Sequence, residues 1–294
     1  MLNNHRISKL LDDARYYEDH RMWLHAVQVY ERLIHELPAE WKYRVRLGNV
    51  YLEMGNLNAA EQVLLQALRY DNQNPDVLYT LGLAAYQGED YTRALYYLEQ
   101  LAARNIPKVH YSLGLVHWRR AEFSHAERHF RLAVELDPES ADAALALGET
   151  LLRNENARDA IEPLRRAARL RPDDAVITHA LGLALSRIGQ HQDAVPLYEA
   201  LLHRDPDDRN ATLALANALV SLNQIDAAES ILLKATLRSN NDARLFVMLG
   251  RLSLQRANRS RAEDFFRRAL TIDPDQLDAL EQLRYLAPHG NPAI

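Results

Sequence analysis

Residues 175–208 read AVITHALGLALSRIGQHQDAVPLYEALLHRDPDD, and this stretch decides the fold. Apolar residues recur there at three- and four-residue spacing on both sides of a central glycine: Leu181, Leu185, Ile188, then Gly189, then Ala194, Leu197 and Leu201. This spacing predicts two amphipathic helices joined by a turn. Because helices of roughly 12 residues are marginal alone in water, each pair must pack against neighbouring pairs.

The same pattern repeats along the chain at a fixed period. A leucine–glycine pair marks six copies, and successive glycines are 34, 32, 34, 34 and 68 residues apart: Gly48, Gly82, Gly114, Gly148, Gly182 and Gly250. An alanine follows each of these glycines twelve residues later: Ala60, Ala94, Ala126, Ala160, Ala194 and Ala262. A period in this range predicts stacked copies of one small unit instead of a single globular core.

Most of the units end in a charged residue followed by proline, as at Asp137-Pro138 and Asp273-Pro274. Together with the Leu-Gly pair, the alanine and the large apolar residue four positions after it, this resembles the tetratricopeptide repeat. The resemblance implies an all-α fold, a right-handed α-solenoid (superhelix) of about eight stacked helix-turn-helix repeats with a C-terminal capping helix. Two units depart from the pattern, with Asp13-Ala14 and Leu215-Ala216 in place of Leu-Gly.

The period also predicts the boundaries of the units. We expect eight repeats, at residues 7–40, 41–74, 75–106, 107–140, 141–174, 175–208, 209–242 and 243–276. A lead-in at 1–6 precedes them, and a capping helix at 277–287 and a flexible tail at 288–294 follow. Side chains suited to capping a helix precede three of the expected helices, at Asn74, Asp174 and Asp208.

Composition excludes several classes of function. The chain has no cysteine, which excludes disulfides and thiolate chemistry, and its net charge of −5 argues against nucleic-acid binding. The first residues resemble no signal peptide and no run of about 18 apolar residues occurs, so we expect a cytoplasmic protein without membrane insertion.

Candidate catalytic and metal-binding residues are few. His125 and His129 are one helical turn apart, but no third ligand is evident, and solvent exposure explains the pair better than a metal. His110 and His117 take positions that are apolar or aromatic in other repeats, so we expect packed structural histidines. The sequence has no phosphate loop, nucleophile elbow or paired-carboxylate motif, and it predicts no enzyme and no cofactor.

The resemblance places a partner in the concave groove lined by the first helices of the repeats. An apolar and aromatic stripe falls on these helices: Tyr79, Leu83, Tyr86, Tyr111, Leu115 and Trp118, continued by Leu145 and Leu152. Aromatic side chains suit a binding surface because they give large contact area with few rotors to freeze. Since the repeat pattern itself favours tyrosine at some of these positions, helix stacking is the alternative interpretation.

Three arginines recur at 34-residue spacing near the ends of first helices, namely Arg119, Arg153 and Arg187. Stacking would align them in a column able to hold acidic side chains, phosphates or a terminal carboxylate. The alternative is that they complement the helix dipole, with Glu149 one turn from Arg153.

Other polar groove positions are Arg46, Asn49, Lys108 and His179. The two-carboxylate clamp of some relatives is matched only in fragments, because Val45 stands where its lysine is wanted and Thr80 where its asparagine is wanted. We therefore predict a non-enzymatic scaffold that binds a peptide or helix of a partner protein, acidic and apolar in alternation. Two further hypotheses are self-association into a homodimer and service as an accessory or targeting subunit of a separate enzyme or of secretion or envelope machinery.

Overall fold

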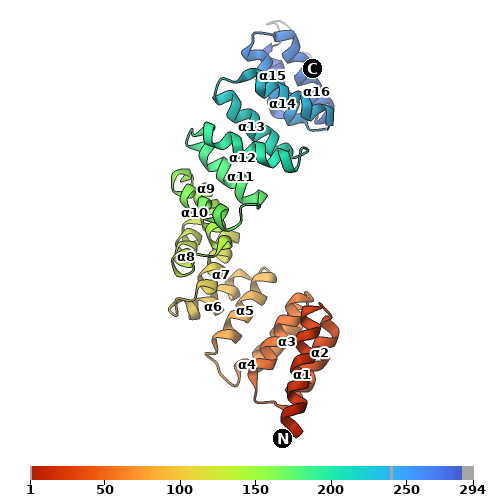
Figure 1. The fold of residues 1–294 in the computed structure, drawn as a ribbon, viewed down its shortest axis with the longest axis vertical. Helices are drawn as coiled ribbons and strands as arrows, with labels where there is room; N and C mark the ends of the chain where they lie inside the picture. Colours follow the sequence, from red (N-terminus) through yellow and green to blue (C-terminus); the bar gives the residue numbers. More distant parts are fainter. Residues whose placement is uncertain (1, 239–240, 287–294) are drawn as a thin grey trace. The chain divides into compact units, whose positions relative to one another are not determined.

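The computed structural model describes residues 2–238 and 241–286, and all regular structure in these ranges is α-helical (Figure 1). Seventeen helices occur in the described residues: α1 Leu2–Asp19, α2 Trp23–Glu36, α3 Trp41–Glu53, α4 Leu57–Leu68, α5 Pro75–Gln87, α6 Tyr91–Ala102, α7 Pro107–Arg119, α8 Phe123–Leu136, α9 Ala141–Arg153, α10 Ala157–Leu170, α11 Ala175–Arg187, α12 His191–Arg204, α13 Arg209–Ser221, α14 Ile225–Arg238, α15 Ala243–Gln255, α16 Arg259–Ile272 and α17 Leu277–Leu286. The chain is an all-α helical repeat solenoid, as the sequence predicts.

The helices fall into two compact units, residues 1–150 and residues 151–294. In each unit a helix packs mainly on the helices before and after it in the sequence, as α7 packs on α6 and α8, and α15 on α14 and α16. First helices of adjacent repeats also touch, because α5 contacts both α3 and α7. The fold is therefore built from contacts between neighbours in sequence.

The repeated small residues are the points of closest approach between the two helices of a repeat. The alanine that recurs at one position of the second helix is completely buried in every repeat: Ala26, Ala60, Ala94, Ala126, Ala160, Ala194, Ala228 and Ala262. A Cβ added to Gly114 would lie 2.5 Å from a ring carbon of Phe130, and one added to Gly182 would lie 2.7 Å from a ring carbon of Tyr198. Only glycine leaves room for the large side chain at these positions.

The turn between the two helices has the same backbone conformation in every repeat. The residue that lies seven positions after the glycine of the Leu-Gly pair, or after the alanine that replaces it, has a φ between 54° and 81° in each repeat. These residues are Arg21, Gly55, Glu89, Ala121, Glu155, Gly189, Asn223 and Ala257. This left-handed conformation costs an L-residue roughly 1–2 kcal/mol. Six of the eight repeats therefore carry this cost, since glycine occupies only two of the positions.

Arginines near the ends of second helices tie successive repeats together. Arg104 donates to the carbonyl of Gln73 at 3.2 Å, and Arg238 donates to the carbonyl of Pro206 at 3.2 Å. In both cases the acceptor lies in the loop that leads into the repeat containing the arginine. These bonds satisfy loop carbonyls that lie outside the helices.

Helix starts follow the sequence closely, and the chain ends differ in one respect. Asn74, Asp174 and Asp208 all accept backbone N–H groups of the helices that follow them, as predicted. Helix α1 begins at Leu2, so it includes residues that the repeat period assigns to a lead-in.

The last described helix is α17, which corresponds to the expected capping helix. It packs on α16 and buries Ala279 and Leu286, while Leu277 at its start is 71% exposed. Residue 287 and the expected tail at 288–294 lie outside the described residues. None of the helices in the described ranges is long and apolar enough to span a bilayer.

Candidate binding site on the first helices

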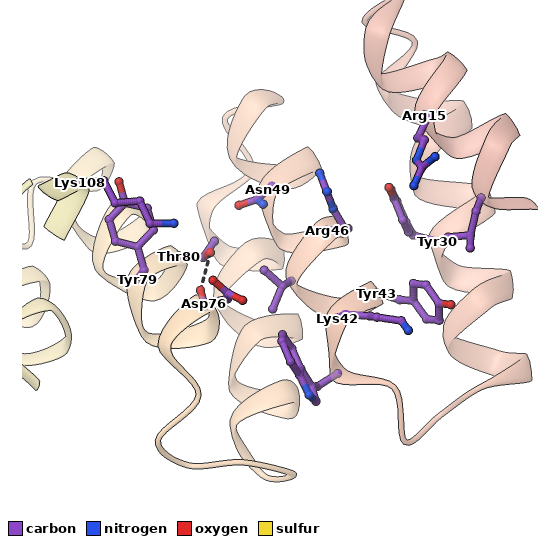
Figure 2. Close-up of a pocket in the computed structure, with 13 residues that line it drawn as sticks. Arg15, Tyr30, Lys42, Tyr43, Arg46, Asn49, Asp76, Tyr79, Thr80 and Lys108 are labelled. Atoms are coloured by element: carbon purple, nitrogen blue, oxygen red, sulfur yellow. Dashed lines mark hydrogen bonds between the residues drawn. The ribbon is translucent and has the colours of Figure 1, made fainter. Parts of the chain in front are cut away.

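A cavity of about 580 Å³ opens among the first helices of the N-terminal unit (Figure 2). Four of the residues predicted to bind a partner line it: Arg46, Asn49, Tyr79 and Lys108. The other nine lining residues were not predicted from the sequence: Leu11, Arg15, Tyr30, Trp41, Lys42, Tyr43, Val45, Asp76 and Thr80. The structure thus gathers residues of four consecutive repeats around one space.

Most of the lining residues occupy the same few positions of the repeat. Lys42, Asp76 and Lys108 each lie six residues before the marked glycine of their repeat, and Arg15 takes the position of Asn49 one repeat earlier. A search by repeat position would have found Arg15. It was missed because the first repeat has Asp13-Ala14 in place of Leu-Gly.

The charged lining of the cavity is predominantly cationic. Four of the thirteen lining residues are basic, namely Arg15, Lys42, Arg46 and Lys108, whereas Asp76 is the one acidic residue among them. Figure 2 shows these basic side chains around the cavity, with Arg15 on α1, Lys42 and Arg46 on α3, and Lys108 on α7. An open, predominantly cationic cavity favours an anionic ligand.

Two carboxylates outside the lining set partly neutralise these cations. Nη1 of Arg46 is 3.8 Å from Oε2 of Glu18, and Nζ of Lys42 is 3.0 Å from Oε2 of Glu40. The hydrogen bond to Glu40 raises the pKa of Lys42. Exposed ion pairs of this kind are individually weak and exchange readily, so both cations can turn to a ligand.

Tyrosines form part of the lining of the cavity. Burial and a hydrogen bond to Glu18 raise the pKa of Tyr30 well above its usual range, so its hydroxyl stays protonated and donates to that carboxylate. The Lys108 ammonium lies 4.5 Å from the centre of the Tyr79 ring, and the Tyr79 hydroxyl is 3.3 Å from Oγ of Ser112. Tyr79 therefore links the repeats of α5 and α7.

The aromatic stripe has a second cluster, which lies on α5 and α7. Nε of Arg119 donates to the Tyr86 hydroxyl at 3.1 Å, and its guanidinium carbon lies 5.6 Å from the centre of the Trp118 ring. The predicted ligand group Arg119 is therefore engaged with Trp118 of its own helix and with Tyr86 of the preceding repeat. Arginine stacked in this way keeps its charge and leaves outer N–H groups for a ligand.

Three further residues of the stripe are partly buried. Leu83 is partly buried against Leu52 and Ala84, and the Tyr111 ring lies 5.8 Å from that of Phe130. Leu115 is half-buried on α7. For these three the structure offers a stacking role, which is the alternative interpretation given for the stripe.

Three predicted residues belong to the C-terminal unit. Nη1 of Arg187 donates to the carbonyl of Leu152 at 2.7 Å, which ties α11 to the end of α9. The His179 ring lies 6.1 Å from the Tyr198 ring, and Arg153 is exposed on α9. Because Arg119 lies in the other unit, a column formed with Arg153 and Arg187 stays a prediction.

One of the expectations about the histidines is wrong. The described residues hold no group of three or more histidine, cysteine or acidic side chains placed to bind a metal. His110 and His117 are buried, as expected. His129 is not a solvated surface residue, since it is half-buried and its ring stacks against that of His117.

The repeats match known sequence families. Three family models, each described as tetratricopeptide repeat, match the sequence. One matches residues 11–75, 45–110 and 111–175, a second matches 189–252 and a third matches 243–276. A comparison with curated proteins found no match.

Solved structures of repeat proteins resemble the fold. YrrB, described as a TPR protein with an unusual peptide-binding site, aligns at a TM-score of 0.53 and 21% identity, over 66% of this chain and 97% of its own. MamA residues 41 to the end, from Desulfovibrio magneticus RS-1, aligns at 0.54 and 19%, over 58% and 97%. PilF of Pseudomonas aeruginosa aligns at 0.50 and 19%, over 83% and 97%. At these identities the likeness concerns the fold alone.

Proposed function

Because this chain belongs to the tetratricopeptide repeat family, we propose that it is a non-enzymatic scaffold that binds an acidic segment of a partner protein. The proposed site is the cavity lined by Arg15, Lys42, Arg46 and Lys108, in the N-terminal unit. The observation that carries the proposal is the excess of four basic over one acidic lining residue, in a chain whose net charge is −5. The cavity thus carries an excess of basic residues although the chain as a whole is acidic.

The shape and the polar groups of the cavity support a peptide as the ligand. Its volume of about 580 Å³ lies within the range of about 300–1,000 Å³ that is usual for binding clefts. Asn49 offers both donors and acceptors to a peptide backbone, and Tyr79 offers an aromatic face to an apolar side chain. YrrB, which has a similar fold and is described as having a peptide-binding site, gives further support to a peptide ligand.

The proposal is tested by selecting ligands from a displayed random-peptide library on the intact protein. We expect the selected peptides to be enriched in aspartate and glutamate. The variant Arg46→Glu/Lys108→Glu should no longer select these peptides. Each substitution replaces a cation of the cavity by a carboxylate, which repels the acidic side chains of the peptide. The affinity for the unaltered protein should fall as salt is added.

A matched variant controls for the change in net charge. Lys234→Glu/Arg268→Glu makes the same charge change on α14 and α16, where both side chains are exposed and lie outside the cavity. This variant should select the same acidic peptides as the unaltered protein. If neither variant differs from the unaltered protein, or if the selected peptides have no acidic bias, the assignment of the cavity is wrong.

A second candidate function is self-association, and the surface of the C-terminal unit favours it. Leu277 and Tyr285 on α17 are 71% and 84% exposed, and Leu237 at the end of α14 is 87% exposed. Light scattering on the Leu277→Lys/Tyr285→Lys variant tests this idea. If the unaltered protein is a dimer and the variant is a dimer too, the dimer does not depend on these residues of α17. If both proteins are monomers, the hypothesis of self-association is wrong.

The remaining expectations concern the compartment and the accessory role. A cytoplasmic location and service to a separate enzyme or to secretion or envelope machinery stay predictions from the sequence. Capture of partners from a lysate with the unaltered protein and with Arg46→Glu/Lys108→Glu would identify the machinery that depends on the cavity. Catalytic activity of the purified chain would contradict the scaffold assignment.

A further inference from the structure

Four histidines of the fourth repeat form a continuous stack between α7 and α8. The rings of His117 and His129 are 5.4 Å apart and nearly parallel, at 5°. His110 lies 5.4 Å from His129 at 24°, and His125 lies 5.2 Å from His117 at 25°. Two rings come from each helix, so the stack forms part of the contact that holds the two helices together.

The other repeats place apolar or uncharged residues at the central positions of this stack. The counterparts of His129 are all apolar or aromatic: Val29, Val63, Tyr97, Pro163, Leu197, Ile231 and Phe265. The counterparts of His117 carry no formal charge at neutral pH: Tyr17, Tyr51, Ala85, Leu151, Leu185, Leu219 and Ser253. The fourth repeat thus has titratable rings where the fold needs only packing.

The hydrogen bond inside the stack depends on the state of protonation. Nδ1 of His110 and Nδ1 of His129 are 3.1 Å apart, and such a bond needs a proton on one nitrogen and a lone pair on the other. His110 is only 3% exposed, and its Nε2 atom is buried without a hydrogen-bond partner. A second proton on this pair of Nδ1 atoms would therefore break the bond and create an imidazolium cation in a desolvated site.

The groups that face His129 oppose a positive charge on it. They are His117 and His110 from α7, together with Arg128 and His125 from α8. Burial is the largest cause that lowers the pKa of His129, to about 4, and burial also lowers that of His110. One carboxylate contacts the stack: Glu122 is hydrogen-bonded at 2.7 Å to His117 and paired at 2.9 Å with Arg120.

We propose that the stack of His110, His117, His125 and His129 is a proton-sensitive lock, which keeps α7 and α8 packed at neutral pH and releases them on mild acidification. Among the described residues these side chains do not form a group of three or more ligands placed to bind a metal, which disfavours a metal site as the use of this cluster. An uncharged stack packs as the apolar side chains of other repeats do. A charged stack repels itself.

The direction of the pH effect follows from proton linkage. An exposed histidine has a pKa near 6.5, whereas packed His129 has a pKa of about 4. At a pH between these two values, His129 binds a proton when the helices are open but not when they are packed. The lock is therefore complete above pH 6.5 and weakens as the pH falls. A shift from about 6.5 to about 4 raises the opening constant about 30-fold between pH 8 and pH 5.

Release of α7 would also act on the cavity, and this consequence rests on the proposed function. Lys108 lies in the first turn of α7 and supplies one of the four cations, and Tyr79 is tied to α7 through Ser112. Acidification should therefore weaken binding of the selected acidic peptides through loss of Lys108. The opening itself is measured without any ligand, so a failure of the lock and a failure of the peptide site are distinguishable.

Hydrogen exchange read by mass spectrometry on the intact protein tests the lock. Protection factors, which correct for the intrinsic pH dependence of exchange, are measured from pH 8 to pH 5. We expect α7 and α8 to lose about 30-fold in protection, with much smaller losses in α3 and α4, whose contact holds no such stack. Equal losses in both helix pairs would overturn the proposal.

Variants identify the group responsible. The sixth repeat has a leucine, Leu197, at the position of His129, and the third repeat has Leu78 at the position of His110. The variants His129→Leu and His110→Leu therefore introduce residues that the fold already accepts at these positions. Each should reduce the pH dependence of α7 and α8. His203→Leu, which removes an exposed histidine of α12, should leave it unchanged. An undiminished acid response in both stack variants would overturn the proposal.

Discussion

At the scale of single residues, the packing of the repeat depends on glycine, which has no Cβ atom, at the point where the two helices meet. A Cβ on Gly182 would lie 2.7 Å from one ring carbon of Tyr198 and 2.8 Å from another. Tyr198 is 1% exposed and its hydroxyl is 3.3 Å from Oγ of Ser186, so the ring has little freedom to move. The substitution Gly182→Leu should therefore destabilise the protein by about 1–3 kcal/mol, measured by urea denaturation followed by circular dichroism.

A double-mutant cycle separates this clash from a general intolerance of the site. Tyr198→Ala leaves a cavity beside Gly182, and an alanine at 182 then meets open space instead of a ring. The cost of Gly182→Ala should be smaller in the Tyr198→Ala background than in the unaltered protein. Additive costs would show that the ring does not restrict residue 182.

At the scale of elements, the turn between the two helices carries backbone strain in the six repeats that have no glycine there. Gly189 has φ of +81° and an added Cβ would meet no atom within 4 Å, so Gly189→Ala tests conformation alone. We expect a loss of roughly 1 kcal/mol. Glu155, with φ of 59° at the same place, should give the opposite result, and Glu155→Gly should raise the melting temperature. A stabilising effect of Gly189→Ala would contradict this account.

Elements that depend on one repeat alone could be predicted from the sequence. The apolar period gives the helices, and the side chains of Asn74, Asp174 and Asp208 mark their starts, because these signals are local. The left-handed turn residue is different. Glycine marks it at Gly55 and Gly189, and asparagine, which also tolerates a positive φ, occupies it at Asn223. The arginine, glutamates and alanines at the other five positions carry no such signal.

The candidate site was predicted only in part, because its geometry depends on neighbouring repeats. Arg46 and Lys108 could be assigned to the groove from their repeat positions. The contacts of Arg119 with Trp118 and with the Tyr86 hydroxyl depend on side-chain conformations. The repeat period of the sequence does not determine these conformations. His129 was misassigned to the surface for the same reason, since its partners His110 and His117 lie on the other helix of the repeat.

At the scale of the whole molecule, stability is the sum of terms from each repeat and from its contacts with the next. The described helices contact neighbours in sequence, and the first helices of adjacent repeats also touch. Damage to one repeat should then remain local, in contrast to a globular domain with one cooperative core. Ligand binding in the N-terminal unit should accordingly survive a lesion in the C-terminal unit.

Hydrogen exchange on the Gly182→Leu variant tests this local cooperativity. Protection should fall most in α11 and α12, which hold the overpacked contact, and less in α13, which packs on both. Helices α1 to α5 should keep the protection that they have in the unaltered protein, because they belong to the N-terminal unit and residue 182 does not. A uniform loss of protection along the chain would mean that the repeats unfold as one unit, and the interface terms between repeats would then dominate the intrinsic stability of each.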